Sequence, residues 1–507
     1  MTNPLPKKVA GVKGFRLLFG ATIVIALLNL YAPAHPTLTE RLLASLLIAL
    51  TCIPISMWLS GRDPYTPLLT LISLLYGVYC AWPVFALSKY SQAGCSFLTD
   101  WSIEYSLGLA CVGLASMLWG YYCRLTRHVA RRLPRFALRW DDVRAVQTVA
   151  LLLICVGFVS RVAFFHYLEF TSDPFHPRVS TALQQPLTWL VNSSLLGLTI
   201  LFILALYGRL TALSRTLMWC SAGVLVLLGS ATGSVYQGVQ VGLLLLFAYS
   251  TIRRRIPWAI LGLGFAALLI LQPAKTRLRS VASQQVVSAG AFWRLQKLAE
   301  VTNKLFLWVM NEPKTFLDEG VTRLSMTPMF ACVVEQTPGT IPYWNGYTYY
   351  PLLTKFVPRF LWQGKAIEDT GTSFPQRYGI VGANDFTTDV NLPQLIEAYI
   401  NFGPVGVVGV MVIIGATYRL VQAMLIGEHT GLGELVAGVY IFAGLLQIET
   451  NASLVIGGIA YQFLHVFVVG LAVNGLRTSR RVQPTAFQTD EPSGFMRKRD
   501  APGPSAP

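Results

Sequence analysis

The residues best suited to bind a ligand are cations in a long polar interval of an otherwise apolar chain. The stretch 357–379, VPRFLWQGKAIEDTGTSFPQRYG, sets three of them among aromatic residues and glycines. Together with one cation further upstream, the candidates are Arg323, Arg359, Lys365 and Arg377. A guanidinium offers a planar fork of N–H donors that matches a pair of anionic oxygens. These side chains could therefore bind an anionic ligand. Alternatively, Arg359 and Lys365 could pair with Glu368 or Asp369, and Arg323 could cap a helix or pair with Asp318 or Glu319.

A carboxylate follows these cations in the sequence and could act as a base. Glu397 falls one turn inside a predicted membrane helix that starts at residue 393, and ionisable groups in membrane spans are functional candidates. Transfer to a hydroxyl group needs a base near the attacking oxygen. Glu397 could instead complement the dipole of its helix or pair with an arginine. The other candidate bases are Asp385, Asp389, His166 and His176.

Aromatic residues crowd the same interval, between glycine and asparagine. They are Tyr343, Trp344, Tyr347, Tyr349, Tyr350 and Trp362. Aromatic rings with a polar handle can stack on the apolar faces of sugars and bond their hydroxyl groups. We take Tyr347 and Trp362 as candidate sugar contacts. Membership of an interfacial aromatic belt explains any one of these residues equally well.

The composition places these residues in a membrane protein. Of the 507 residues, 53% are hydrophobic and only 13% are charged, whereas soluble domains carry about 25% charged residues. The apolar residues form runs of roughly 17–25, the length of a membrane-spanning helix, and the short alternating runs of a membrane β-barrel are absent. The first run, 15–31, follows Lys7, Lys8 and Lys13 and carries Arg16 at its start. It lacks a small-residue cleavage site, which predicts a signal-anchor helix.

The apolar runs predict an all-α polytopic membrane protein with about twelve spans. The expected helices cover 15–32, 41–59, 66–88, 102–123, 145–168, 187–207, 217–231, 235–250, 256–273, 393–421, 434–449 and 453–476. The chain then divides into nine helices over 1–273, a large loop over 274–392, three helices over 393–476 and a Pro/Ser-rich tail over 477–507. The first part of the large loop has the periodicity of an amphipathic helix on the membrane surface.

The basic residues predict the orientation of these helices. More than half of the 40 Lys and Arg lie in loops that share one side when the N-terminus is cytoplasmic, as the positive-inside rule requires. Both termini are then cytoplasmic, and the loop 274–392 lies outside. The basic loop 124–144 is better explained by topology and anionic lipid than by nucleic acid. Cys95 and Cys332 fall in predicted outside loops and are candidates for a disulfide.

Several of these segments resemble the O-antigen polysaccharide polymerase (Wzy) family. The resemblance covers about residues 320–415 and rests on TRLS, NGYTYY, KFVPRFLWQGKAIEDTGTSFPQRYG and LPQLIEAYINFGPVGVVGVMVIIGA. The family pattern Pro-Arg-x-x-Trp-x-x-Lys falls on residues 358–365, and Glu-x-Tyr-x-Asn-Phe-Gly falls on 397–403. The chain departs from the family at Gln363 and Gly364, where Pro-Asp is common.

This resemblance implies a GT-C-like, metal-independent glycosyltransferase without cofactors at the outer face of the bacterial inner membrane. It would join repeat units of O-antigen or exopolysaccharide carried on undecaprenyl pyrophosphate. The predicted partners are these lipid-linked glycans, the bilayer and a chain-length-regulating (Wzz-like) co-polymerase. The cations Arg323, Arg359, Lys365 and Arg377 would hold the pyrophosphate, with Arg277 and Arg279 next, and Glu397 would be the base. An O-antigen ligase and a lipid-linked oligosaccharide flippase are the alternatives.

Overall fold

The computed structural model describes most of the chain from residue 20 to residue 476. The exceptions are residues 21, 31–35, 62, 64–66, 88–89, 96–97, 137, 139, 172–183, 232–234, 267–268, 270–299, 301–310, 356, 358–361, 363–367, 387 and 428–429. The regular secondary structure of the described part is helical, with one isolated β-bridge between Gln92 and Cys95.

In the part of the chain that the structure describes, seven helices are long and apolar enough to cross a membrane, so the chain is a multi-pass membrane protein. They are α2 (Leu38–Leu59), the continuous unit of α3 (Leu68–Tyr76), η1 (Gly77–Ala81) and α4 (Trp82–Ala86), α5 (Asp100–Tyr122), α7 (Val143–Thr171), α8 (Gln184–Leu206), α17 (Gln394–Leu425) and α19 (Ala452–Leu476). Three shorter apolar helices accompany them: α9 (Ala212–Ala231), α10 (Val235–Arg253) and α18 (Leu432–Leu445).

The all-helical polytopic architecture expected from the sequence is confirmed at this level. Seven of the twelve predicted spans coincide with the long helices, and the ranges 217–231, 235–250 and 434–449 correspond to the shorter ones. The ranges 15–32 and 256–273 are described only in part, with helix at 22–30 and 258–266. The predicted surface helix in the first part of the large loop lies almost wholly outside the described residues.

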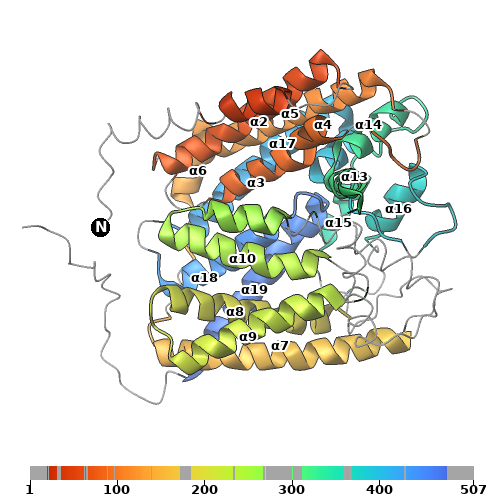
Figure 1. Ribbon diagram of the computed structural model, residues 1–507. Helices are drawn as coiled ribbons and strands as arrows, with labels where there is room; N and C mark the ends of the chain where they lie inside the picture. The colour runs from red at the N-terminus through yellow and green to blue at the C-terminus, as the bar shows by residue number, and fades with distance from the viewer. Residues whose placement is uncertain are drawn as a thin grey trace, which may run out of the picture.

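The helices pack in layers along a common direction (Figure 1). One layer contains α2, α5 and the α3–α4 unit, with α17 behind it; α10, α18 and α19 follow, and α7, α8 and α9 lie on the far side. The closest packing is between α5 and α17 and between α7 and α8. At the first of these contacts, a Cβ on Gly120 would stand 2.1 Å from the Val412 carbonyl oxygen, and one on Gly415 would stand 2.0 Å from that of Met117. Glycine thus permits a backbone approach that a side chain would prevent.

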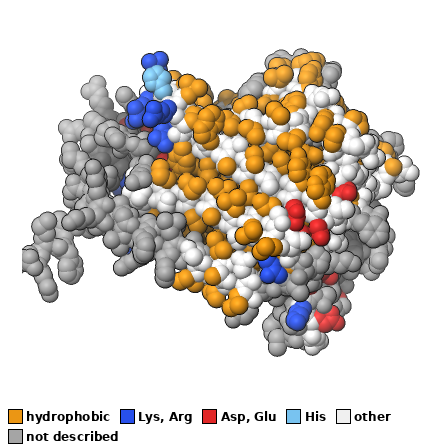
Figure 2. Space-filling model, turned by 90° about the horizontal axis from the view of Figure 1, so that it is seen from above, with side chains coloured by type: hydrophobic (Ala, Val, Ile, Leu, Met, Phe, Trp, Pro, Cys, Tyr) orange, Lys and Arg blue, Asp and Glu red, His pale blue; other side chains and the backbone are white. Residues whose placement is uncertain are grey.

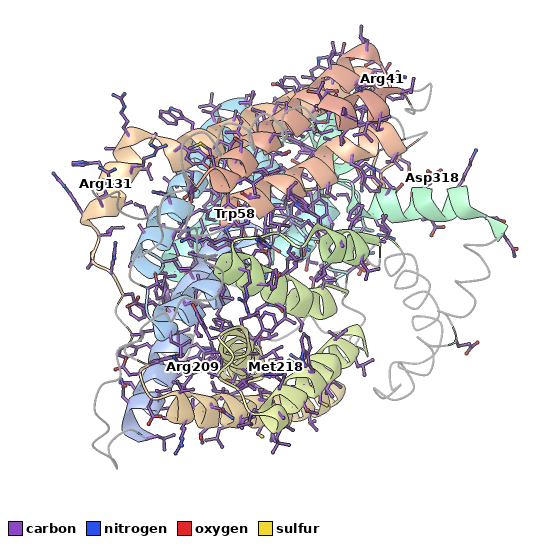
Figure 3. All side chains as sticks on the ribbon, turned by 60° about the vertical axis from the view of Figure 1, so that its left-hand side comes forward. Arg41, Trp58, Arg131, Arg209, Met218 and Asp318 are labelled. Atoms are coloured by element: carbon purple, nitrogen blue, oxygen red, sulfur yellow. A yellow bond between two sulfur atoms is a disulfide. The ribbon has the colours of Figure 1, made fainter. Side chains whose placement is uncertain are left out.

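The two ends of the bundle differ in what they carry. The basic helix α6 (Arg124–Arg132) lies at one end, and α13 (Pro313–Leu324), α14 (Thr327–Gln336), α15 (Tyr350–Thr354) and α16 (Thr370–Arg377) lie at the other (Figure 1). Figure 2 shows a broad apolar face with basic side chains gathered at one end. Figure 3 labels Arg131 on α6 and Asp318 on α13 at opposite ends.

A disulfide joins Cys95 to Cys332 at the α14 end. It links the segment before α5 to α14 across 237 residues of sequence. The side-chain amide of Gln336 lies 3.2 Å from each sulfur. The structure thus pairs two cysteines that the sequence offered only as candidates for a disulfide.

Helix α17 is kinked at Gly403, and the kink positions the loop above it. Gly403 has φ 63° and ψ −154°, a conformation that essentially only glycine adopts. Pro404 follows and has no N–H for the Ile400 carbonyl. That carbonyl instead accepts the Trp344 N–H at 2.8 Å, and the Asn401 carbonyl accepts the Asn345 N–H at 3.2 Å. The break in the helix therefore supplies the acceptors that hold the 344–349 loop.

Gly403→Ala should destabilise the protein by about 1–3 kcal/mol, because the new side chain meets a strained backbone conformation. The added Cβ would also stand 2.8 Å from the Tyr343 hydroxyl oxygen. Thermal unfolding of the detergent-purified protein measures the effect. Gly409→Ala is the matched control in the same helix, where a Cβ meets no atom within 4 Å. Equal melting temperatures for the two variants would contradict the role given to the kink.

Candidate functional site

A cluster of polar side chains lies where the first turns of α17 and α19 meet the segments around α15 and α16. We call it the polar cluster; its members are Lys355, Glu368, Glu397, Asn401, Asn451 and Ser453. It sits at the end of the bundle opposite α6 (Figure 1). The side chains come from four separate stretches of sequence, which the folded helices bring together.

The centre of the polar cluster is an ion pair between Lys355 and Glu368, with 2.6 Å between Nζ and Oε2. Both side chains are largely enclosed, at 16% and 17% exposure. Asn451 donates to Glu368 Oε1 at 3.0 Å, and the Ser453 hydroxyl also donates to that oxygen. The Lys355 ammonium donates to the Ser453 carbonyl at 3.2 Å. Both charges thus have polar partners, which a largely buried ion pair requires.

The lysine stem lies flat against α19. A Cβ on Gly457 would stand 2.3 Å from Lys355 Cδ, so glycine provides the space for the stem. The Tyr461 hydroxyl donates to the Lys355 carbonyl at 2.7 Å. Two positions one turn apart on α19 therefore fix the lysine by its side chain and by its backbone.

The ion pair closes the segment that carries the predicted anion-binding motif. Lys355 precedes residues 356–367 and Glu368 follows them, so the two ends of this segment are held together. Trp362 is described and is 43% exposed. Arg359 and Lys365 lie outside the described residues. Glu368 was a predicted alternative partner for Arg359, and in the structure it pairs with Lys355. Lys355 was not among the residues predicted from the sequence.

Glu397 is fully enclosed, at 0% exposure. Its Oε2 accepts the backbone N–H of Ala452, the first residue of α19, at 2.6 Å. Among the described residues, neither its Oε1 nor the nearby hydroxyl of Tyr349 has a hydrogen-bond partner. Burial raises the pKa of Tyr349, and the Glu397 carboxylate raises it further, so the phenol stays protonated. The carboxylate thus stabilises the N-terminus of a neighbouring helix, α19. The sequence had suggested the same kind of role, but at the N-terminus of the helix that carries Glu397.

Asn401 connects the polar cluster to the aromatic loop. Its side-chain N–H group donates to Thr348 Oγ1 at 2.7 Å and to the Glu397 carbonyl at 2.8 Å. Its side-chain oxygen accepts the Gly346 N–H at 2.9 Å. Tyr347, the predicted sugar contact, extends from this loop with 58% exposure and an edge contact to Trp344. A buried amide therefore fixes a loop that presents an exposed tyrosine.

The other predicted cations differ in the contacts that their side chains make. Arg377 is exposed, donates to the Pro342 carbonyl at 2.8 Å and lies over the Trp344 ring at 5.2 Å. Arg323 is exposed on the last turn of α13 and forms no ion pair with a described residue. Arg277 and Arg279 lie outside the described residues, as do the side chains of His166 and His176. Within the described ranges, no group of three His, Cys, Asp or Glu residues could hold a metal ion.

Lys355, Asn451 and Ser453 were not predicted from the sequence as site residues. One pattern could have found the last two: the short polar run ETNAS between two apolar helices. Asn and Ser are common just before a helix, where their side chains bond free backbone N–H groups. Here they bond Glu368 instead. Nothing in the local sequence marks Lys355 as the partner of a glutamate thirteen residues later.

The fold and this polar cluster define a helical multi-pass membrane protein with its polar side chains gathered at one end of the bundle. The chain belongs to the family described as Domain of unknown function (DUF8712), whose model matches residues 148–477. The whole polar cluster lies within that range. No curated protein and no solved structure matches the chain.

Removing one member of the central ion pair should cost more stability than removing both. Lys355→Met or Glu368→Gln alone leaves an enclosed group without its partner and should lower stability by about 1–3 kcal/mol. In the double variant the losses should not add, with a coupling free energy of about 0.5–3 kcal/mol. Thermal unfolding of the four proteins measures the coupling. Arg323→Met is the control for a cation without a partner, and additive losses would contradict the pairing.

Glu397→Gln should fold normally, because an amide oxygen can still accept the Ala452 N–H. Glu397→Ala removes that acceptor and should cost about 1 kcal/mol, the usual value of a helix cap. Circular dichroism and thermal unfolding compare the two variants. Equal stability of Glu397→Ala and the unaltered protein would contradict the capping role.

Proposed function

We propose that this protein is a polysaccharide polymerase that joins lipid-pyrophosphate-linked repeat units at the outer face of the bacterial inner membrane. The observation that carries the proposal is the Lys355–Glu368 ion pair. It holds the two ends of the cation-bearing segment 356–367 together at the start of α19. The sequence resemblance to the O-antigen polymerase family supplies the reaction.

The orientation follows from charge and from the disulfide. The basic end of the bundle, formed by α6, is assigned to the cytoplasm by the positive-inside rule. The opposite end then faces the periplasm, an oxidising compartment in which disulfides persist, and Cys95 and Cys332 are paired there. In this proposal the bundle has about twelve spans, a GT-C-like arrangement and both termini in the cytoplasm.

The proposed reaction moves a glycan from one lipid carrier to another. The acceptor hydroxyl oxygen bonds to the anomeric carbon of the donor, and the bond from that carbon to the phosphate oxygen breaks. The lipid pyrophosphate leaves with the electron pair, and the hydroxyl proton passes to a base. Negative charge develops on the departing group, so preformed cations near it lower the barrier.

The chain's own residues divide this work. We assign Arg359 and Lys365 to the pyrophosphate, with Arg323, Arg377, Arg277 and Arg279 as further ligands. Tyr347 and Trp362 are exposed and suited to stack on sugar rings. Glu397 is enclosed and occupied by the Ala452 N–H, so we assign it to positioning α19 rather than to the acceptor proton.

Deletion of the gene tests the reaction class. Surface polysaccharide displayed on a gel should show a single capped repeat unit in place of the polymer ladder. Normal ladders that are not attached to the lipid A core would indicate a ligase. Loss of all periplasmic product would indicate a flippase, and either result would overturn the proposal.

Arg359→Ala should abolish polymer at a normal protein level, because the cation would no longer stabilise the leaving pyrophosphate. Loss of one such charge typically costs about 10²–10³ in rate. Arg131→Ala, at the α6 end (Figure 3), is the control and should leave the ladder unchanged. Glu397→Gln should retain polymer, since it keeps the helix contact. Wild-type polymer from Arg359→Ala, or no polymer from a well-folded Glu397→Gln, would refute the respective assignment.

A further inference from the structure

A cavity of about 170 Å³ lies inside the bundle, between α8, α10, α18 and α19. Its main polar and aromatic lining residues are Trp189, Asn192, Gln240, Tyr461, Gln462 and His465. None of these six residues is a Lys, Arg, Asp or Glu. The histidine among them is buried and forms hydrogen bonds with its neighbours. The cavity is not part of the polar cluster and is not used in the proposed reaction.

The cavity lies next to the polar cluster along α19. Ser453, Gly457, Tyr461 and His465 recur every four residues and so share one face of that helix. The first two contact Lys355 by hydrogen bond and by packing, and the last two line the cavity. Tyr461 belongs to both, since its hydroxyl donates to the Lys355 carbonyl. The cavity therefore lies beside the residues of α19 that contact Lys355.

The three amide side chains of the cavity have no hydrogen-bond partner within the described chain. Asn192, Gln240 and Gln462 make no side-chain hydrogen bond there, and the indole N–H of Trp189 is buried without an acceptor. Polar groups inside a membrane bundle normally find partners. By contrast, His465 contacts Ser193 Oγ at 3.1 Å and the Tyr440 hydroxyl at 3.3 Å. The unmatched amide groups point to an absent ligand with several donors and acceptors.

The chemistry of the lining defines that ligand. None of the described residues that line the cavity is a Lys, Arg, Asp or Glu, so a phosphate or carboxylate would lack a counter-charge among them. Amides offer donors and acceptors side by side, which hydroxyl groups match. Trp189 and two tyrosines add aromatic surface. The volume is below the roughly 300–1,000 Å³ of drug-sized sites, which suits a single ring rather than an oligosaccharide.

We propose that this cavity binds one uncharged sugar ring of the substrate. The assignment deepens the proposed function and rests on it, because it makes the sugar part of the lipid-linked repeat unit. The amides of Asn192, Gln240 and Gln462 bond the ring hydroxyls, and Trp189 donates its N–H to a ring or hydroxyl oxygen. The site thereby selects which sugar the protein accepts in the repeat unit.

Binding of free sugars to the full-length protein in detergent tests the site without any lipid substrate. The probes are methyl glucoside, methyl galactoside and N-acetylglucosamine, with glucose 6-phosphate as the charged comparison, and saturation-transfer NMR reports contact. At least one neutral probe should bind, and the phosphorylated sugar should not. Absence of binding by all three neutral probes, or equal binding of the phosphorylated one, would overturn the proposal.

Variants locate the binding. Gln462→Leu should lower the affinity for the neutral probe by about tenfold or more, because it removes hydrogen bonds worth about 1.4 kcal/mol. Gln240→Leu, on α10, is the second variant in case the first unfolds. Asn474→Leu makes the same kind of change at an exposed position of α19 away from the cavity and should leave binding unchanged. Equal affinity of a folded cavity variant and this control would place the sugar elsewhere.

The two proposals can fail separately. Sugar binding with a flippase or ligase phenotype after gene deletion would keep the cavity assignment and remove the polymerase. If gene deletion replaces the polymer with a single capped repeat unit but the purified protein binds no sugar, the polymerase proposal stands and the cavity assignment is removed.

Discussion

The arrangement of the candidate site depends on one missing hydrogen-bond donor. Because Pro404 lacks an N–H, the Ile400 carbonyl has no partner within its own helix and accepts the Trp344 N–H instead. Gly403 turns the backbone so that the Asn401 carbonyl accepts the Asn345 N–H in the same way. The loop held there carries Tyr347, and the Asn401 side chain bonds two more of its residues. A local defect in α17 thus becomes the attachment point for a distant segment.

At this end of the bundle, several polar side chains form hydrogen bonds with groups on other helices. Glu397 on α17 accepts the first N–H of α19, and residues at the start of α19 bond the carboxylate of Glu368. Both carboxylates are thus held by the start of α19, so α17, α19 and the segment that ends at Glu368 depend on one another for their positions. Such mutual dependence gives a rigid platform at the membrane boundary, where backbone groups freed from helices need partners. A rigid platform is what precise positioning of a large substrate requires.

Much of the fold could be predicted from the sequence, because membrane helices are marked by long apolar runs. The spans matching α2, α5, α8 and α19 were predicted to within a few residues. The disulfide was predictable only as a candidate, since the sequence cannot show that two cysteines approach each other. The kink was not predicted, although the Gly-Pro pair is visible, because the apolar run continues across that pair over residues 402–416. The pairing of Lys355 with Glu368 could not be read from local patterns, since the partners are brought together by α19.

The close contact between α5 and α17 joins the region that the family model matches to a helix outside that region. The family match begins at residue 148 and includes α17, but α5 lies before it. A chain trimmed to 148–477 would expose to lipid the glycine-lined surface around Gly415 and would leave Cys332 as an unpaired thiol. The N-terminal helices therefore act as a covering layer whose removal changes the redox chemistry and the oligomerisation tendency of the remainder. Expression of the matched region by itself would yield a different molecule rather than a smaller version of this one.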